Sequence, residues 1–203
     1  RHYEYSTIDL TVRLNLLKNL YTEAKFGRQA TSQKRKEYYY KDNRACVNGK
    51  YNGRAAINQY NNVDWTFEWT GNYDFKVADK HDFKLMAGYS FQQFDYEWFY
   101  AENRNFPTDV FETNDLGAGD YQQVSGRNGM DSEKTREKSI AFLGRLNYNF
   151  DDLILFTGSL RYEGNSKFGK DNKWGLFPAA SAAIRLTKLS FLQDNEAIND
   201  LKL

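Results

Sequence analysis

The sequence predicts an all-β fold, the wall of an antiparallel transmembrane β-barrel, and three observations favour it. Apolar and polar residues alternate with a period of two along most of the chain, as in strands with one apolar and one polar face. Short turns and long loops alternate between the expected strands, as in membrane barrels. The 203 residues include only 2 prolines, which fits long uninterrupted strands. We expect about seven strands.

The alternation is clearest in the C-terminal third of the chain, where three strands follow one another. The first expected strand covers 139–150 and the second covers 154–162, and each places aliphatic and aromatic residues on one face and polar residues on the other. Residues 151–152 form a tight turn between them. A polar, glycine-rich loop at 164–175 precedes the third strand, which ends near Leu186.

Four further strands are expected in the N-terminal half. They cover about 5–16, 20–34 and 55–76, and the fourth begins at Phe83. In the fourth strand the aromatic residues change from odd to even positions after 92–93. An inserted residue would produce such a change, so this pattern predicts a β-bulge there.

Short and long connections alternate along the chain, and this order favours a membrane barrel over a soluble β protein. Alternation alone also fits a soluble β-sandwich. A soluble meander has no reason to place its short connections on one side, whereas outer-membrane barrels have short turns at one end and long loops at the other. The expected short turns are 18–19, 77–80 and 151–152, and the expected long loops are 35–53, 101–136 and 164–175.

Composition excludes several classes of protein. The formal net charge of +1 gives no field for nucleic acid, so no nucleic-acid partner is expected. The mean hydropathy of -0.81 excludes a bundle of membrane helices, but not a barrel whose strands turn half of their residues to water. Aromatic residues make up 17% of the chain, which suits interfacial girdles and also sugar-binding modules. The single cysteine, Cys46, cannot form an internal disulfide.

The sequence contains no motif of an enzyme. Neither His2 nor His81 has neighbours at metal-ligand spacing, and nucleophile-elbow, P-loop and dinucleotide motifs are absent. We therefore expect no catalytic residue, no metal and no cofactor. Asp64 and Glu68 share one strand face, which permits a glycoside-hydrolase carboxylate pair. A face turned to a watery lumen explains these two residues as well, and we favour that interpretation.

The candidate functional residues lie on the polar strand faces and in an aromatic segment. The polar faces are expected to line a lumen of mixed charge, and the aromatic segment is a candidate for stacking against sugar rings, with packing against loops as the alternative. The predicted lumen-lining or substrate-contacting residues are Asp64, Glu68, Asn72, Arg145, Asn147, Arg161, Tyr96, Trp98 and Tyr100.

Two stretches carry a resemblance to a known family. The run 144–150 (GRLNYNF) and a longer motif within 161–181 resemble the SusC/RagA family of TonB-dependent outer-membrane transporters. The final residues, 198–203, resemble that family's approach to a further strand. The sequence departs from the family wording at Glu163, Asn165, Lys167, Ala179 and Ile184. The motif residues are Gly164, Asn165, Ser166, Phe168, Gly169, Trp174, Gly175, Phe177, Pro178 and Ser181.

The resemblance implies a function for the protein to which the chain contributes. Residues 1–203 would be an internal part of a 22-strand plugged barrel, without signal peptide, plug or remaining strands. Such a barrel in the bacterial outer membrane imports glycans or peptides with a SusD-like surface lipoprotein. A TonB complex, acting through the N-terminal plug, supplies the energy. The expected partners of this segment are the lipoprotein, the TonB complex, outer-membrane lipid, the other strands, the plug and the substrate.

Two alternative functions stay open at this point. One is a passive porin or a structural outer-membrane barrel, which a missing plug domain would favour. The other is a soluble, aromatic-rich β-domain that binds carbohydrate, which predicts solubility without detergent and no asymmetry of loop lengths.

Overall fold

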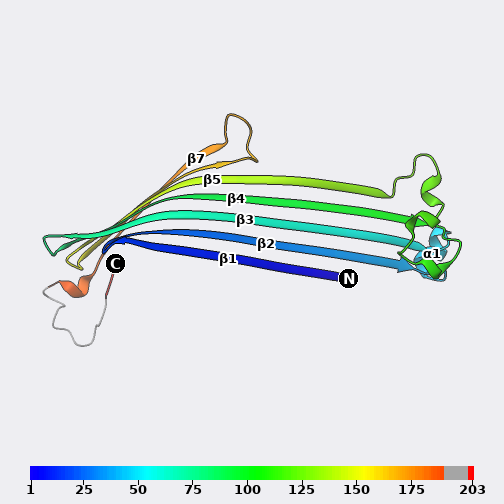
Figure 1. The fold of residues 1–203 in the computed structure, drawn as a ribbon, viewed down its shortest axis with the longest axis horizontal. Helices are drawn as coiled ribbons and strands as arrows, with labels where there is room; N and C mark the ends of the chain where they lie inside the picture. Colours follow the sequence, from blue (N-terminus) through cyan, green and yellow to red (C-terminus); the bar gives the residue numbers. More distant parts are fainter. Residues whose placement is uncertain (190–200) are drawn as a thin grey trace. The chain divides into compact units, whose positions relative to one another are not determined.

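The computed structural model describes residues 1–189 and 201–203, and it confirms the all-β fold. The seven strands form one sheet in the order of the sequence (Figure 1). The last two strand pairs are antiparallel, and short turns or loops join consecutive strands. The strands are β1 (His2–Leu17), β2 (Leu20–Tyr39), β3 (Arg54–Val77), β4 (His81–Arg104), β5 (Met130–Phe150), β6 (Ile154–Asn165) and β7 (Trp174–Ile184).

In residues 1–189 and 201–203, helical structure is confined to short segments outside the strands. Asn43 caps helix α1 (Arg44–Gly49) by accepting a hydrogen bond from the backbone N–H of Ala45 at 2.9 Å. Within the described residues, no helix has the length and apolar character needed to cross a membrane. The 3₁₀ turns are η1 (Asp109–Phe111), η2 (Leu116–Ala118), η3 (Tyr121–Gln123) and η4 (Leu186–Lys188).

The chain divides into two compact units. We call the first the loop unit, because it holds α1 and the turns η1 to η3, and the second the turn unit, because it holds the short turns between strands. The loop unit comprises Arg1–Ile8, Arg28–Asp64 and Phe94–Arg136, and the turn unit comprises Asp9–Gly27, Trp65–Gln93 and Glu137–Leu203.

In the turn unit, the strand register confirms the predicted alternation. Phe142 lies opposite Tyr162, and Tyr148 lies opposite Phe156. On the other face Arg145 lies opposite Ser159. Directly opposite residues share one face of an antiparallel pair, so β5 and β6 have one apolar face and one polar face. The apolar side chains are exposed rather than buried; that of Phe142 is 51% exposed.

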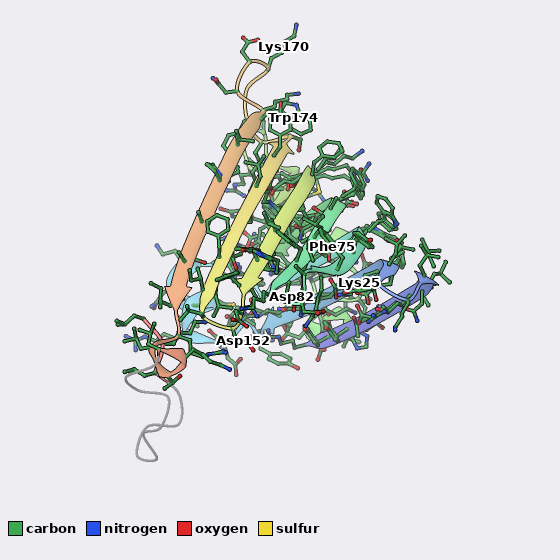
Figure 2. The ribbon with its side chains drawn as sticks, turned by 90° about the vertical axis from the view of Figure 1, so that its left-hand side faces the viewer. Lys25, Phe75, Asp82, Asp152, Lys170 and Trp174 are labelled. Carbon is green, nitrogen blue, oxygen red and sulfur yellow. The ribbon has the colours of Figure 1, made fainter. Side chains whose placement is uncertain are left out.

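The apolar face of the turn unit carries two rows of aromatic rings. In the first row Tyr73, Phe75, Phe83 and Tyr148 follow one another with centroid separations of 5.2, 5.0 and 4.9 Å. In the second row Phe67, Tyr89, Phe142 and Trp174 follow one another at 6.4, 5.6 and 6.4 Å. Figure 2 labels Phe75 in the first row and Trp174 in the second. We call them the turn-side row and the loop-side row.

The spacing of the two rows matches a membrane wall. Phe142 and Tyr148 are six residues apart along β5, and six residues also separate Phe83 from Tyr89 on β4. At about 3.3 Å per residue the rows are roughly 20 Å apart along the strands. Outer-membrane barrels have an apolar band of about 25 Å between two aromatic girdles. In the described residues the buried apolar side chains are few and mostly small, so the apolar face has no second layer to cover it.

The β-bulge predicted near 92–93 is wrong. Tyr89 contacts Phe142 in the turn unit, and Asp95 pairs with Arg136 in the loop unit. Six residues separate Tyr89 from Asp95, and six residues separate Phe142 from Arg136, so neither strand has an inserted residue between these pairs. The aromatic residues therefore change face because the surroundings of the two faces change, and β4 continues with unbroken pleating.

The tight turn predicted at 151–152 is confirmed. Asp151 and Asp152 both have positive φ, at 48° and 55°, and the N–H of Leu153 donates to the carbonyl of Phe150 at 2.8 Å. Aspartate tolerates this left-handed conformation better than most residues do. The chain after β7 is partly described: Lys202 forms an antiparallel bridge with Arg185, as the resemblance at 198–203 predicted for a strand, while 198–200 lie outside the described residues.

Strand lengths differ sharply along the sheet. β6 has 12 residues and β7 has 11, close to the roughly 9–11 that cross a bilayer. The strands β2 to β5 have 20, 24, 24 and 21 residues, so they must continue beyond the bilayer. Pairing between β5 and β6 begins at Ser139, which leaves the preceding part of β5, 130–138, with no partner in β6.

Neighbouring residues on opposite faces of β5 give the first prediction. Leu146→Arg places a charge on the apolar face between the two aromatic rows and should destabilise the full-length protein by about 2–4 kcal/mol. Asn147→Arg, on the polar face, should cost less than about 1 kcal/mol, mainly through loss of its hydrogen bond with Thr157. Urea unfolding in lipid vesicles measures both values. Equal costs would contradict a lipid-facing wall.

Candidate functional site

The structure separates the predicted site residues into two sets. Those on the C-terminal strands lie in the turn unit with Glu68 and Asn72, while Asp64 and the three aromatic residues lie in the loop unit. Along β3 the Cα atoms of Asp64 and Glu68 are about 13 Å apart, from four residues at about 3.3 Å each. Glycosidases place their two carboxyl groups about 5–9.5 Å apart, so this pair does not fit that chemistry.

The polar face of the turn unit contains a groove of about 380 Å³, which we call the lumen groove. Glu68 and Arg161, both predicted lumen-lining residues, line it together with Asp9 and Lys25. Gly27 also lines it, and a Cβ atom there would lie 2.5 Å from the Thr66 hydroxyl oxygen. A side chain at position 27 would therefore require Thr66 to move. The groove thus presents charges of both signs to an aqueous space.

The other predicted residues of the turn unit lie on its polar face, outside the groove. The Asn147 carbonyl oxygen accepts a hydrogen bond from the Thr157 hydroxyl at 2.9 Å, and the Asn72 amide donates to the Thr70 hydroxyl at 3.2 Å. Arg145 is exposed. These contacts are neighbours on the wall and form no reaction centre.

A second groove, of about 560 Å³, lies in the loop unit, and we call it the amide groove. Of the three predicted aromatic contacts, only Tyr96 lines it. The amide oxygen of Asn62, another lining residue, is buried and has no hydrogen-bond partner among the described residues. Buried polar atoms are normally paired, so this oxygen marks a position where a ligand or water can donate. The groove is lined by Gln33, Arg35, Asn58, Tyr60, Asn62 and Tyr96.

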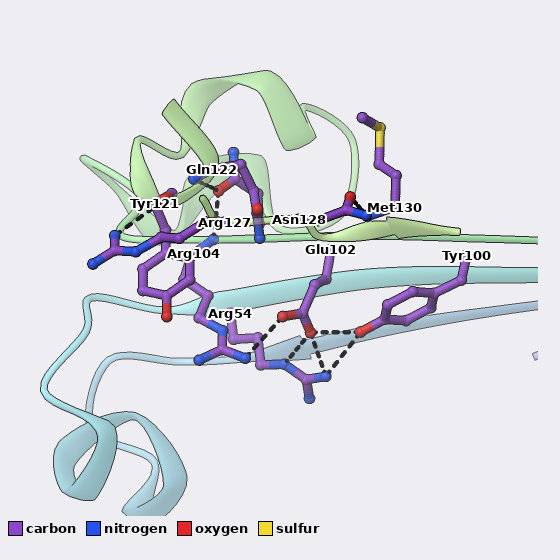
Figure 3. A network of polar contacts seen from close by, with 10 residues as sticks. Arg54, Tyr100, Glu102, Arg104, Tyr121, Gln122, Arg127, Asn128 and Met130 are labelled. Atoms are coloured by element: carbon purple, nitrogen blue, oxygen red, sulfur yellow. Dashed lines mark hydrogen bonds and ion pairs between the residues drawn. The ribbon is translucent and has the colours of Figure 1, made fainter. Parts of the chain in front are cut away.

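Trp98 and Tyr100, the other two predicted contacts, form hydrogen bonds with charged side chains. The Trp98 indole N–H donates to the Glu133 carboxylate at 3.2 Å. The Tyr100 hydroxyl donates to the Glu102 carboxylate at 2.5 Å and accepts from the Arg54 guanidinium at 3.2 Å. Figure 3 shows Tyr100 as part of a polar network at the strand ends.

The network around Glu102 was not predicted from the sequence. Arg54 donates twice to Glu102, at 2.9 and 2.6 Å, and Arg104 donates at 2.8 Å (Figure 3). The guanidinium of Arg104 also lies 4.8 Å from the ring centroids of both Tyr51 and Tyr121. The side chain of Glu102 is only 10% exposed, so these charge-assisted bonds are shielded from water.

Asn103 connects the same strand end to the loop 105–129. Its amide group donates to the carbonyls of Leu116 and Gly119 at 2.8 and 2.6 Å, and its oxygen accepts from the N–H of Gln122 at 3.2 Å. The N–H of Glu102 donates to the carbonyl of Gly129 at 2.7 Å. The long loop is therefore an ordered structure, and we call α1 and 105–129 the loop platform.

Tyr38 near the end of β2 and Tyr40 just after it bind the loop platform through hydrogen bonds. The Tyr38 hydroxyl donates to Asp109 at 2.6 Å, and the Tyr40 hydroxyl donates to Glu112 at 2.8 Å. Burial and the neighbouring Asp109 carboxylate raise the pKa of Tyr38 well above its usual value. Tyr38 therefore stays protonated and keeps its donor role at all ordinary pH values.

The charges of the network also shift the pKa of Glu102. Burial alone would raise that pKa, but the hydrogen bonds from Tyr100, Arg54 and Arg104 outweigh it, so the pKa of Glu102 falls below its usual value. The carboxylate thus stays ionised and holds both guanidinium groups.

The motif residues within 161–181 build the β6–β7 hairpin. Gly164 lies opposite Trp174, and a Cβ atom on Gly164 would lie 2.7 Å from the indole ring, so glycine makes room for that ring. Ser166 and Lys138 form two hydrogen bonds of 2.8 Å. The N–H of Ser166 donates to the carbonyl of Lys138, and the N–H of Lys138 donates to the hydroxyl oxygen of Ser166. On β7 the motif partners across the pair are Gly175 to Glu163, Phe177 to Arg161, Pro178 to Leu160 and Ser181 to Thr157.

The remaining motif residues shape the turn that follows. The side chain of Asn165 accepts from the N–H of Lys167 at 2.8 Å, and the N–H of Phe168 donates to the carbonyl of Asn165 at 3.4 Å. Gly169 has open space around its Cα atom. The motif is therefore a structural signature of one hairpin, and its residues form no reaction centre.

Comparison with known proteins identifies the family. No protein-family model matches the chain. TonB-dependent receptor P26 of Formosa agariphila is 30% identical over 151 residues, which cover 74% of this chain and 15% of that protein. TonB-dependent receptor SusC of Bacteroides thetaiotaomicron is 31% identical over 128 residues, which cover 63% of this chain and 12% of that protein. The chain belongs to the SusC/RagA family of TonB-dependent receptors.

Solved structures of this family show the same fold. The RagAB peptide transporter matches 98% of this chain and 21% of the solved chain, with a TM-score of 0.86 and 19% sequence identity. Among the relatives compared by sequence, receptor P39 of Formosa agariphila is 28% identical and matches 98% of this chain and 18% of its own length. The chain thus spans less than a quarter of each relative. SusC/RagA receptors lie in the bacterial outer membrane, so the apolar face of the sheet faces lipid.

The Glu102 network gives the second prediction. Glu102→Gln removes the negative charge between Arg54 and Arg104, and should lower the free energy of local opening in 105–129 by about 2–3 kcal/mol. Hydrogen exchange of the platform amides in the full-length receptor measures this. Glu97→Gln is the matched control, because the exposed Glu97–Lys134 pair should contribute less than about 1 kcal/mol. Equal effects would show that the network does not hold the platform.

The third prediction concerns pH. Because the pKa of Glu102 is lowered in the folded protein, its stabilisation is complete above the reference value of 4.5 and is lost as the pH falls toward the lowered value. Exchange protection of the platform, corrected for intrinsic rates, should therefore fall as the pH is lowered below 4.5. Glu102→Gln should remove this component. The same decline in that variant would assign the pH dependence to other carboxylates.

Proposed function

We propose that residues 1–203 form part of the barrel domain of an energised outer-membrane importer. The observation that carries the proposal is the polar face behind the aromatic rows, which holds the lumen groove in the turn unit, on a chain of the SusC/RagA family. β1 and β7 are the edges of the described sheet, and hydrocarbon does not tolerate unpaired strand edges. We therefore assign this sheet to a larger, plugged barrel of the 22-strand type.

The substrate assignment is a neutral, polar polymer: a glycan or a peptide. The amide groove supports it, because two tyrosine rings and several amide groups can stack on and hydrogen-bond with hydroxyl or amide groups of a chain. Tyr60 and Tyr96 are the residues we assign to stacking, and the Asn62 oxygen is assigned as an acceptor. The solved relative is named as a peptide transporter, and a second relative is SusC.

The partners we assign are a SusD-like surface lipoprotein and the TonB complex. The loop platform is an ordered surface at the strand ends, which suits contact with a lid protein. Energy from TonB would act through a plug in the lumen, and the mixed charges of the lumen groove can contact that plug. We assign no catalytic role, because the relatives are named as receptors and transporters.

The fourth prediction tests import by the full-length receptor. Uptake of an oligosaccharide or peptide should require TonB, and Tyr60→Ala with Tyr96→Ala should weaken substrate binding at least tenfold, the equivalent of about 1.4 kcal/mol. Phe99→Ala is the control, because Phe99 is an exposed aromatic residue on the opposite face of β4 from Tyr96. Calorimetry with each polymer class identifies the substrate. Uptake that continues without TonB would favour a passive porin.

A further inference from the structure

The β6–β7 hairpin has a position that the other described hairpins lack. Its strands have 12 and 11 residues, about the number that crosses a bilayer, so its loop, 166–173, begins where the bilayer ends. Trp174, the first residue of β7, belongs to the loop-side aromatic row and stacks on Tyr162 at 4.8 Å. In Figure 2, Lys170 lies in this loop, beyond Trp174. The loop is therefore placed at the level of lipid headgroups.

The loop and the adjoining part of β5 concentrate positive charge. Lys167, Lys170 and Lys173 lie in the loop, with Asp171 as its one acidic residue. Ser166 fixes the loop against Lys138 of β5 through two hydrogen bonds of 2.8 Å. Lys138 is exposed on the same face of β5 as Phe142, four residues from that ring. The segment thus carries a net positive charge next to the loop-side row.

Three of these lysines are available to a ligand. Lys167 pairs with Glu137 at 2.6 Å. Lys138, Lys170 and Lys173 are exposed, and within residues 1–189 and 201–203 none of them forms an ion pair. The lysines in the short turn at the end of β3 differ, because Lys76 pairs with Asp82 and Lys80 pairs with Asp151.

An exposed aromatic residue accompanies the charges. Phe168 lies in the loop between Lys167 and Lys170 and is 59% exposed, so its ring is available to an apolar partner. Aromatic residues beside basic residues are typical of segments that enter the boundary between headgroups and acyl chains. The loop therefore combines an apolar contact for acyl chains with cations for phosphate.

We propose that Lys138, Lys170 and Lys173 bind the phosphate groups of an outer-leaflet lipid of the lipid A type, with Phe168 inserted among its acyl chains. Ammonium groups form short charge-assisted hydrogen bonds with phosphate oxygens, and three of them can divide between the two phosphates of one lipid. The bound lipid would hold the receptor wall at a fixed depth and lie against the ring of Trp174.

The test uses the full-length receptor and lipid A as the probe. Native mass spectrometry measures binding of diphosphorylated lipid A to the wild type and to the variant Lys138→Gln, Lys170→Gln, Lys173→Gln. Each lysine near an anionic lipid contributes severalfold, so the triple variant should bind at least about tenfold more weakly. The matched control is Lys36→Gln, Lys41→Gln, Lys50→Gln, which removes three exposed lysines of the loop unit and should bind as the wild type does.

Two further arms identify the source of the phosphate and guard against misfolding. Dephosphorylated lipid A should bind the wild type about as weakly as the triple variant binds the phosphorylated form, and millimolar inorganic phosphate should not compete. The variant Lys138→Arg, Lys170→Arg, Lys173→Arg should retain binding. Equal binding by the glutamine variant and the wild type, equal loss in the control, or displacement by inorganic phosphate would each overturn the proposal.

Discussion

Backbone hydrogen bonding in lipid is the constraint on which this structure depends. The hydrocarbon region offers no partner to N–H and C=O groups, so each strand in it must pair with its neighbours along its full crossing length. The chain meets this requirement with a meander in which sequence neighbours are also spatial neighbours. A sheet that satisfies its backbone in this way needs no internal core, which explains why large side chains such as Leu160 and Phe142 are exposed.

Side chains alternate between the two faces of β4 in both units, but the residue types on one face differ between the units. In the turn unit the odd positions of β4 carry rings such as Tyr89, whereas in the loop unit they carry Asp95 and Glu97, which pair with Arg136 and Lys134. The register is unchanged between these pairs, so the strand keeps one geometry while the outer face changes from lipid to water. This change of surroundings explains why the aromatic residues move from odd to even positions. The sequence shows only which positions are apolar, and a bulge is one of several causes of a change from odd to even positions.

Local sequence patterns predicted the strands, the short turns and the polar face, because each depends on residues close together in the chain. The sites depend on distant residues. Arg54 and Glu102 are 48 residues apart, and no local pattern connects them. The residues of the amide groove come from three long strands and meet only through the pairing register of those strands. The sequence could therefore predict Tyr96 as an aromatic contact, but not the residues that lie beside it. The hydrogen bond that Tyr100 accepts from Arg54 could not be predicted either, because 46 residues separate the two positions.

The difference in length between β5 and β6 has a consequence for how the protein avoids association with other chains. Residues 130–137 of β5 have no partner in β6, and the N–H groups of Met130 and Ser132 donate to the side chains of Asn128 and Asp131 instead. An exposed strand edge can pair with a strand of another chain. Most positions in the second half of this segment are charged, namely Glu133, Lys134, Arg136 and Glu137. An incoming strand would have to desolvate these charges. The segment therefore resists the pairing of strands between neighbouring receptors.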